Sequence, residues 1–215
     1  MTDIFKFWSQ IGAKETMHPA DAPIFSRLKG KHAFDLRCLP LNFSGPLQNA
    51  RVVLLYLSPG LSKHDATFAK TSAGQRFYSE QRTGRAALPN DPSSLGYEWR
   101  RSRLRFLGDW ESALDRIAVM NIGAYHSKTF TDHDVLAALP SSRKALDWAQ
   151  NVLFPEAEAG KRVVICMRAA KYWGLRAGNV YGRSLFAPTA GRSGHMLKGA
   201  MRERIEKAAR SALVP

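Results

Sequence analysis

The sequence predicts an α/β protein, a three-layer α/β/α sandwich around a mostly parallel sheet of four strands. Three apolar runs, at 51–57, 116–122 and 162–167, have the length and composition of parallel strands that are buried on both faces. Segments with helical character alternate with these runs, as expected where helices cover a parallel sheet. The 215 residues contain no linker or internal repeat, so we expect a single domain, 1–215.

The amino-terminal half begins with two short helices, which we expect at 3–12 and 20–29. The second helix has Asp21 near its start, where the helix dipole favours an acid. The first strand then ends in the turn sequence 58–60. Residues 61–109 lack a clean period and predict loops with one or two short helices.

The carboxy-terminal half continues the alternation of strands and helices. A short helix is expected from Asp132, a longer one from 141 to about 152, and another over 168–175. A short fourth strand is expected at 184–187. The last helix, 196–213, has apolar residues at i, i+4 spacing that predict one core-facing stripe, formed by Leu197, Met201, Ile205, Ala209 and Leu213.

The charge balance indicates a nucleic-acid partner. Lys and Arg number 32 against 18 Asp and Glu, which gives a net charge of +14. Arginines interleaved with aromatic residues are concentrated between 63 and 105, and further cations lie between 192 and 210, a pattern suited to phosphates and bases. We expect contacts to DNA, more than to RNA, from Arg100, Arg101, Arg103, Arg192, Ser193 and Lys198. The alternative is a basic surface that only confers solubility.

Several classes of protein are not expected. No apolar run approaches the ~18–20 residues that span a bilayer, and the first ten residues do not resemble a signal peptide. Cys38 and Cys166 lie far apart in apolar contexts, as buried thiols of a reducing compartment do. We therefore expect a cytoplasmic protein without a membrane partner.

A ligand site is expected at the carboxyl ends of the strands, where open parallel sheets bind their ligands. The turn 58–60, Asn121 and the loop that begins at Pro188 all lie at such ends. Glycines 191 and 194 enclose Arg192 and Ser193 ahead of the last helix, as in phosphate-binding loops, although an ordinary connection would look the same. Asn121 could equally hydrogen-bond its own loop.

Four motifs in order resemble the uracil-DNA glycosylase superfamily: RVVLLYLSPG at 51–60, RIAVMNIGAYHSK at 116–128, VVICMRAAKYWGL at 163–175 and APTAGRSGH at 187–195. The resemblance covers about residues 45–210. It implies the α/β/α fold and a base that is flipped into a pocket at the strand ends. It also implies substrate-binding positions, namely Pro59, Gly60, Asn121 and Pro188, with Phe68 or Phe77 as the ring on which the base stacks.

Two positions depart from the family pattern. Ser58 stands where the family has the Asp or Asn that positions the attacking water, and Ala187 stands where it has the His or Asn that stabilises the anionic base. Catalysis would therefore have to recruit Asp65, His126 or His195, although His126 could also be structural. We expect a protein that excises or recognises a damaged or deaminated base, with a non-catalytic nucleic-acid binder on the same fold as the alternative.

A serine hydrolase is the remote alternative, because Ser58 is one residue short of a nucleophile elbow and Asp132 and His195 follow in hydrolase order. Pro59 argues against it, since proline has no N–H for an oxyanion hole. Tyr125 is expected to pack and to bind substrate through its hydroxyl at the rim of the site. Residues 132–134 (Asp-His-Asp) point in different directions from a helix start, so we expect no metal, and no motif predicts a cofactor.

Overall fold

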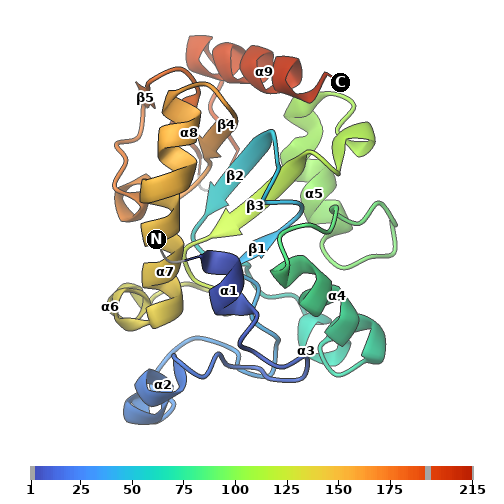
Figure 1. Ribbon diagram of the computed structural model, residues 1–215, viewed down its shortest axis with the longest axis vertical. Coiled ribbons are helices and arrows are strands. Elements are labelled where there is room, and N and C mark those ends of the chain that lie inside the picture. The colour runs from blue at the N-terminus through green and yellow to red at the C-terminus, as the bar shows by residue number, and fades with distance from the viewer. Residues whose placement is uncertain (1–2, 192–194, 215) are drawn as a thin grey trace.

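The protein folds around one mixed sheet of six strands in the order β1-β3-β2-β4-β6-β5 (Figure 1). The computed structural model describes residues 3–191 and 195–214. The four predicted strands are present and run parallel as the centre of the sheet: β2 (Val52–Tyr56), β3 (Ile117–Asn121), β4 (Val163–Cys166) and β6 (Leu185–Ala187). The α/β class is thus confirmed.

The predicted strand number of four is wrong, because an antiparallel strand lies at each edge. β1 (Phe43–Ser44) pairs with β3, and β5 (Asn179–Tyr181) pairs with β6. With two and three residues, these strands are too short to show an alternating pattern in the sequence. Their extended conformation is stabilised by backbone hydrogen bonds to β3 and β6.

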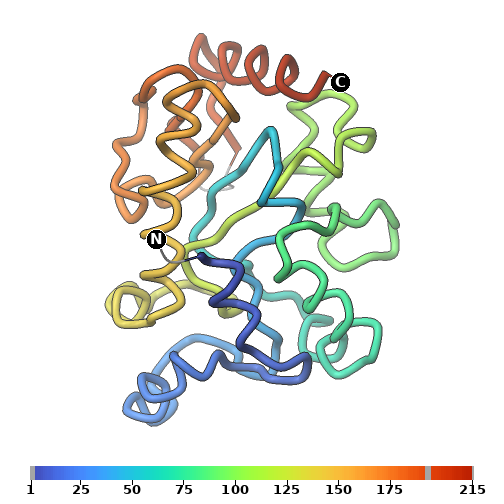
Figure 2. The backbone as a smooth tube through the Cα atoms, viewed as in Figure 1, coloured from blue at the N-terminus to red at the C-terminus, as the bar shows by residue number. Residues whose placement is uncertain are grey.

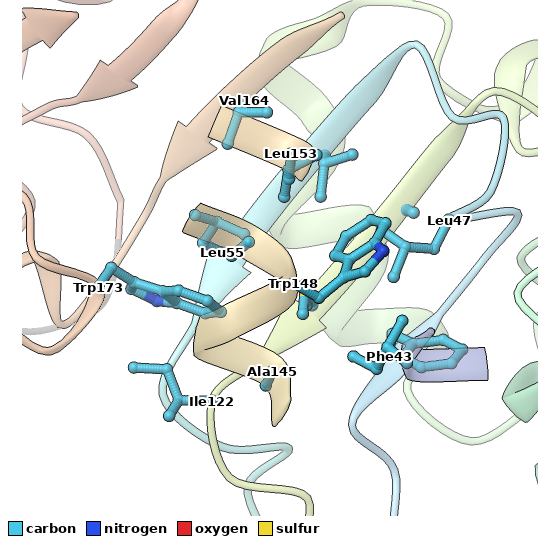
Figure 3. Packing of buried hydrophobic residues seen from close by; sticks show 14 of the residues in the cluster. Phe43, Leu47, Leu55, Ile122, Ala145, Trp148, Leu153, Val164 and Trp173 are labelled. Carbon is cyan, nitrogen blue, oxygen red and sulfur yellow. The ribbon is translucent and has the colours of Figure 1, made fainter. Parts of the chain in front are cut away.

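Alternate residues of the central strands enter two separate cores. Val53 and Leu55 face one layer of helices, made of α1 (Ile4–Trp8), α7 (Pro140–Trp148), the π-helix η3 (Ala149–Leu153) and α8 (Phe154–Glu158). Figure 3 shows Trp148 and Leu153 of this layer over Leu55 and Val164 of the sheet. Val52 and Leu54 face the other layer, made of α5 (Tyr97–Leu104), the 3-10 turns η1 (Arg105–Leu107) and η2 (Glu111–Ala113), and α9 (Ala200–Leu213).

The carboxyl ends of the parallel strands are covered by segments from three parts of the chain. Figure 1 shows α2 (Ala22–Leu28), α3 (Asp65–Phe68) and α6 (His133–Ala138) at the lower end of the view, toward which β2 and β3 point. In Figure 2 the blue amino-terminal segment runs across this end. Leu41 and Asp35 donate backbone hydrogen bonds to Ala124 and His126, so residues 35–41 are bound to the loop after β3.

Several sequence-based expectations about the helices change, and the first helix, expected at 3–12, ends at Trp8. Residues 61–109 contain three helices, since α4 (Ser72–Arg82) lies between α3 and α5. The segment 168–175 holds only the 3-10 turn η4 (Ala170–Trp173). The last helix begins at Ala200, because Gly199 has φ +130°, and Leu197 lies before it with 55% of its surface exposed. None of the helices in the described ranges is long and apolar enough to cross a membrane.

Candidate functional site

Two predicted site residues from different loops meet beyond the carboxyl ends of β2 and β3. Asp65 begins α3, nine residues after the last residue of β2, and His126 lies five residues after the end of β3. Nδ1 of His126 is 3.6 Å from Oδ2 of Asp65, and their side chains are 5% and 13% exposed. The separation is longer than a hydrogen bond, so the two groups interact electrostatically across a short gap.

The environment of Asp65 favours its charged form. Burial raises the pKa of the carboxyl, but the neighbouring His126 ring and the backbone N–H of Ser62 lower it by more. The net pKa lies below the ordinary value for aspartate. Oδ2 accepts the Ser62 N–H at 2.5 Å, which also fixes the orientation of the carboxylate. Asp65 is therefore ionised at neutral pH.

His126 has unused hydrogen-bonding capacity. Both ring nitrogens are buried, and neither has a hydrogen-bond partner among the described residues. A buried polar atom without a partner costs about 1–3 kcal/mol. A ligand that reached Nε2 would recover this energy, so the ring is suited to binding or proton transfer.

The pair is enclosed by residues that sequence reasoning did not single out. Tyr78 of α4 places its ring 6.3 Å from that of His126, and the backbone N–H of Asp35 donates to the His126 carbonyl at 2.8 Å. Burial raises the pKa of the nearby Cys38 thiol to about 12, which makes it unreactive. Phe68 and Phe77, predicted to stack on a base, lie 6.0 Å apart and pack against Tyr78 and its neighbours.

A groove of about 630 Å³ lies beside this cluster and is large enough for a nucleotide-sized ligand. Its lining combines backbone, aromatic and charged groups: Gly30, His32, Ala33, Phe34, Asp35, Leu36, Leu61, Lys128 and Thr129. Asp35 connects the groove to His126. Its carboxylate is bound by Arg37 at 2.6 Å, which holds the pKa of Asp35 at about 2.

The turn after β2 is half-buried at Ser58, Pro59 and Gly60, as the strand-end position implies. Gly60 has φ +72°, a conformation that favours glycine, and no atom lies within 4 Å of the position that a Cβ would occupy. A side chain at Gly60 would therefore point into open space. Pro188, after β6, is buried.

Two other predicted substrate-binding residues have structural contacts. Asn121 is 3% exposed, and its side-chain amide donates to the Leu41 carbonyl at 3.2 Å. Tyr125 is 1% exposed, and its hydroxyl donates to Asp21 at 2.6 Å. The expectation of a Tyr125 hydroxyl at the rim is therefore wrong, because a buried carboxyl group of the amino-terminal segment binds it.

The predicted arginine cluster divides into buried and accessible members. Arg100 is 5% exposed, and its guanidinium donates to the Leu95 carbonyl and to Ser94 Oγ, so its assignment to a nucleic-acid surface is corrected. Arg101 is exposed and pairs with Glu98 at 2.6 Å. Lys198 is exposed. Arg192 and Ser193 lie outside the described residues.

His195 belongs to a different part of the strand-end edge. Residues 189–191 and 195–197 pair through a bridge between Ala190 and Met196. The His195 Nε2 lies 3.4 Å from Ser102 Oγ on α5, and burial, followed by the nearby Arg103, lowers the pKa of the ring. Among the described contacts, none joins His195 to Asp65 or His126.

The geometry of a serine hydrolase is not found at Ser58. The helix that follows begins only at Asp65, whereas a nucleophile elbow leads directly into its helix. Asp132 accepts a hydrogen bond from the Ala33 backbone N–H at 2.7 Å, and His195 is held beside Ser102. The three residues of the supposed triad therefore have separate structural surroundings.

In residues 3–191 and 195–214, no cluster of three or more His, Cys, Asp or Glu side chains could hold a metal ion. A comparison of the chain with protein-family models, curated proteins and solved structures found no match.

Proposed function

We propose that this protein binds nucleic acid and hydrolyses the N-glycosidic bond of a base held at the carboxyl edge of its sheet. The observation that carries the proposal is the meeting of Asp65 and His126, which come from separate loops and form a buried acid–imidazole pair beside a groove. The net charge of +14 supports a polyanionic substrate. The resemblance to uracil-DNA glycosylases in the four strand-end motifs supports the reaction class.

The chemistry requires two kinds of assistance. As the bond between C1′ and the base nitrogen breaks, positive charge develops on the sugar and the base leaves with the electron pair. The Asp65 carboxylate stabilises the sugar cation and accepts the proton of the water that attacks C1′. His126 stabilises the leaving base by a hydrogen bond from its ring.

The test is a glycosylase assay on single- and double-stranded oligonucleotides that carry uracil, hypoxanthine or xanthine, with abasic sites detected by alkaline cleavage. We expect cleavage by the wild type and a loss of at least a hundredfold in Asp65→Asn, which keeps the shape but removes the charge. Asp109→Asn, which changes an exposed aspartate, is the matched control and should cleave as the wild type does. Equal activity of both variants would remove Asp65 from the mechanism.

A non-catalytic binder is the second candidate, and it is favoured by Ser58 and Ala187. Ala187 is fully buried in β6, so this position offers no polar group to a leaving base. A protein that binds the same oligonucleotides without cleaving any of them would support this second function.

A further inference from the structure

A surface distinct from the Asp65–His126 pair surrounds Trp99 on α5. The Trp99 ring lies 5.1 Å from that of Tyr56, the last residue of β2, with an interplanar angle of 63°. This contact holds the indole in place and leaves Trp99 38% exposed. The other four tryptophans are at most 7% exposed: Trp8, Trp110, Trp148 and Trp173. Trp99 is therefore a fixed aromatic face that is open to solvent.

Arginines lie near the residues that contact or neighbour this aromatic face. Arg103 lies one helical turn after Trp99, and Arg103 and Arg168 are both near enough to the Tyr56 hydroxyl to oppose the rise in its pKa that burial causes. Arg103 and Arg105 also lie near His195. We call Trp99, Arg103, Arg105, Arg168 and His195 the Trp99 surface.

The positive charge of the Trp99 surface is not neutralised by carboxylates within the described chain. Arg103, Arg105 and Arg168 form no ion pair among the described residues, whereas Arg101 and Arg202 pair with glutamates. The Tyr56 hydroxyl and Arg103 Nη1 are buried atoms without a described hydrogen-bond partner. The surface therefore combines unpaired cations with a rigid ring.

We propose that the Trp99 surface binds a single-stranded segment of nucleic acid, with a base stacked on Trp99 and adjacent phosphates bound by Arg103, Arg105 and Arg168. An exposed ring beside cations suits an unpaired base, because every base has a face that can stack once it is released from a duplex. The proposal rests on the proposed nucleic-acid function and specifies the form of the substrate. It does not depend on cleavage.

The test measures the binding of a short labelled oligothymidylate by fluorescence anisotropy, with a duplex of the same length as comparison. Stacking on one aromatic residue corresponds to a five- to hundredfold effect, so we expect Trp99→Ala to weaken binding by about this factor and Trp99→Phe by much less. The conservative variant shows that the loss follows the ring and not the fold. Oligothymidylate should also protect the intrinsic fluorescence from acrylamide, because Trp99 is the exposed tryptophan.

Arg168→Gln tests the phosphate contacts, and Arg51→Gln, at the opposite end of the strands, is its matched control. Loss of one contact should lower the slope of log affinity against log salt by about 0.7 in Arg168→Gln, while Arg51→Gln keeps the wild-type slope. Equal affinity for duplex, or an unchanged affinity in Trp99→Ala, would overturn the proposal. Because the probe contains no excisable lesion, these outcomes are independent of the cleavage assay.

Discussion

Tyr125→Phe separates a structural role of Tyr125 from the substrate-binding role that its sequence position suggested. The hydroxyl donates to Asp21 Oδ2 at 2.6 Å and accepts the His18 backbone N–H at 3.1 Å. Asp21 is fully buried, and its other oxygen accepts the Ser141 N–H at 3.0 Å. This hydrogen-bond network joins the amino-terminal segment, the loop after β3 and the start of α7.

Removing the hydroxyl has two costs. The lost hydrogen bond to the Asp21 carboxyl contributes about 1.5 kcal/mol, and the buried His18 N–H left without a partner costs about 1.5 kcal/mol more. We therefore expect Tyr125→Phe to lower the free energy of unfolding by about 3 kcal/mol. Urea denaturation followed by circular dichroism at pH 7 measures this difference.

Tyr97→Phe is the matched control, because its hydroxyl donates to Glu111 at 2.9 Å in an exposed position. This variant should lose less than about 0.5 kcal/mol. If Tyr125→Phe lost no more than Tyr97→Phe, the network would not hold the segments together. A stable Tyr125→Phe protein with impaired oligonucleotide binding would instead restore the substrate-binding role.

Three further predictions concern the surroundings of the site. Asp35→Asn should lower the free energy of unfolding by about 1 kcal/mol at pH 7, a small loss because Arg37 is 75% exposed. Since the pKa of Asp35 is lowered to about 2, this stabilisation is present above pH 4 and is lost as the pH falls through 2. If the wild type remained more stable than Asp35→Asn below pH 2, the prediction would be wrong. Gly74→Ala places a Cβ against the Phe68 carbonyl oxygen and should lower the free energy of unfolding by about 2 kcal/mol in urea denaturation, whereas a gain in stability would show that α3 and α4 separate easily. Asn42→Ala removes the amide that donates to the Asn121 carbonyl and accepts from the Trp8 indole N–H, and it should lower the free energy of unfolding by about 3 kcal/mol; a loss under 1 kcal/mol would contradict this value.

The sequence is most informative about the fold at positions that are buried in the core, because these positions require apolar residues. The apolar runs at 51–57, 116–122 and 162–167 correspond to β2, β3 and β4, because a strand buried on both faces must be apolar throughout. In the last helix, Ile205, Ala209 and Leu213 are buried as the stripe predicted. Leu197 continues the same spacing but lies outside the helix, since the conformation of Gly199 interrupts it.

The site is less predictable, because its contacts join distant parts of the chain. Asp65 and His126 could be predicted as site residues because each follows a strand, but no local pattern predicts that their side chains lie close together. Asp35 and Tyr78 have no sequence signal for a site, since their positions beside His126 depend on how the segment 35–41 and α4 pack. Arg100 has a sequence signal for a binding site, as a member of a basic run, but its guanidinium forms hydrogen bonds within the protein.

The residues at two strand ends, Ser58 and Ala187, have a common geometric consequence for the proposed chemistry. Ser58 lies two residues after the end of β2 and Ala187 is the last residue of β6, so neither position offers a charged side chain. The proposed chemistry is displaced outward, to Asp65 on the next helix and His126 on the next loop, where the two groups meet at 3.6 Å. A carboxylate in this position can act only on a sugar that lies further from the sheet than one bound directly at the strand ends. The groove lined by Asp35 and Leu61 is the space that we propose for this sugar, so the proposed activity depends on the segment 30–36 as well as on the sheet.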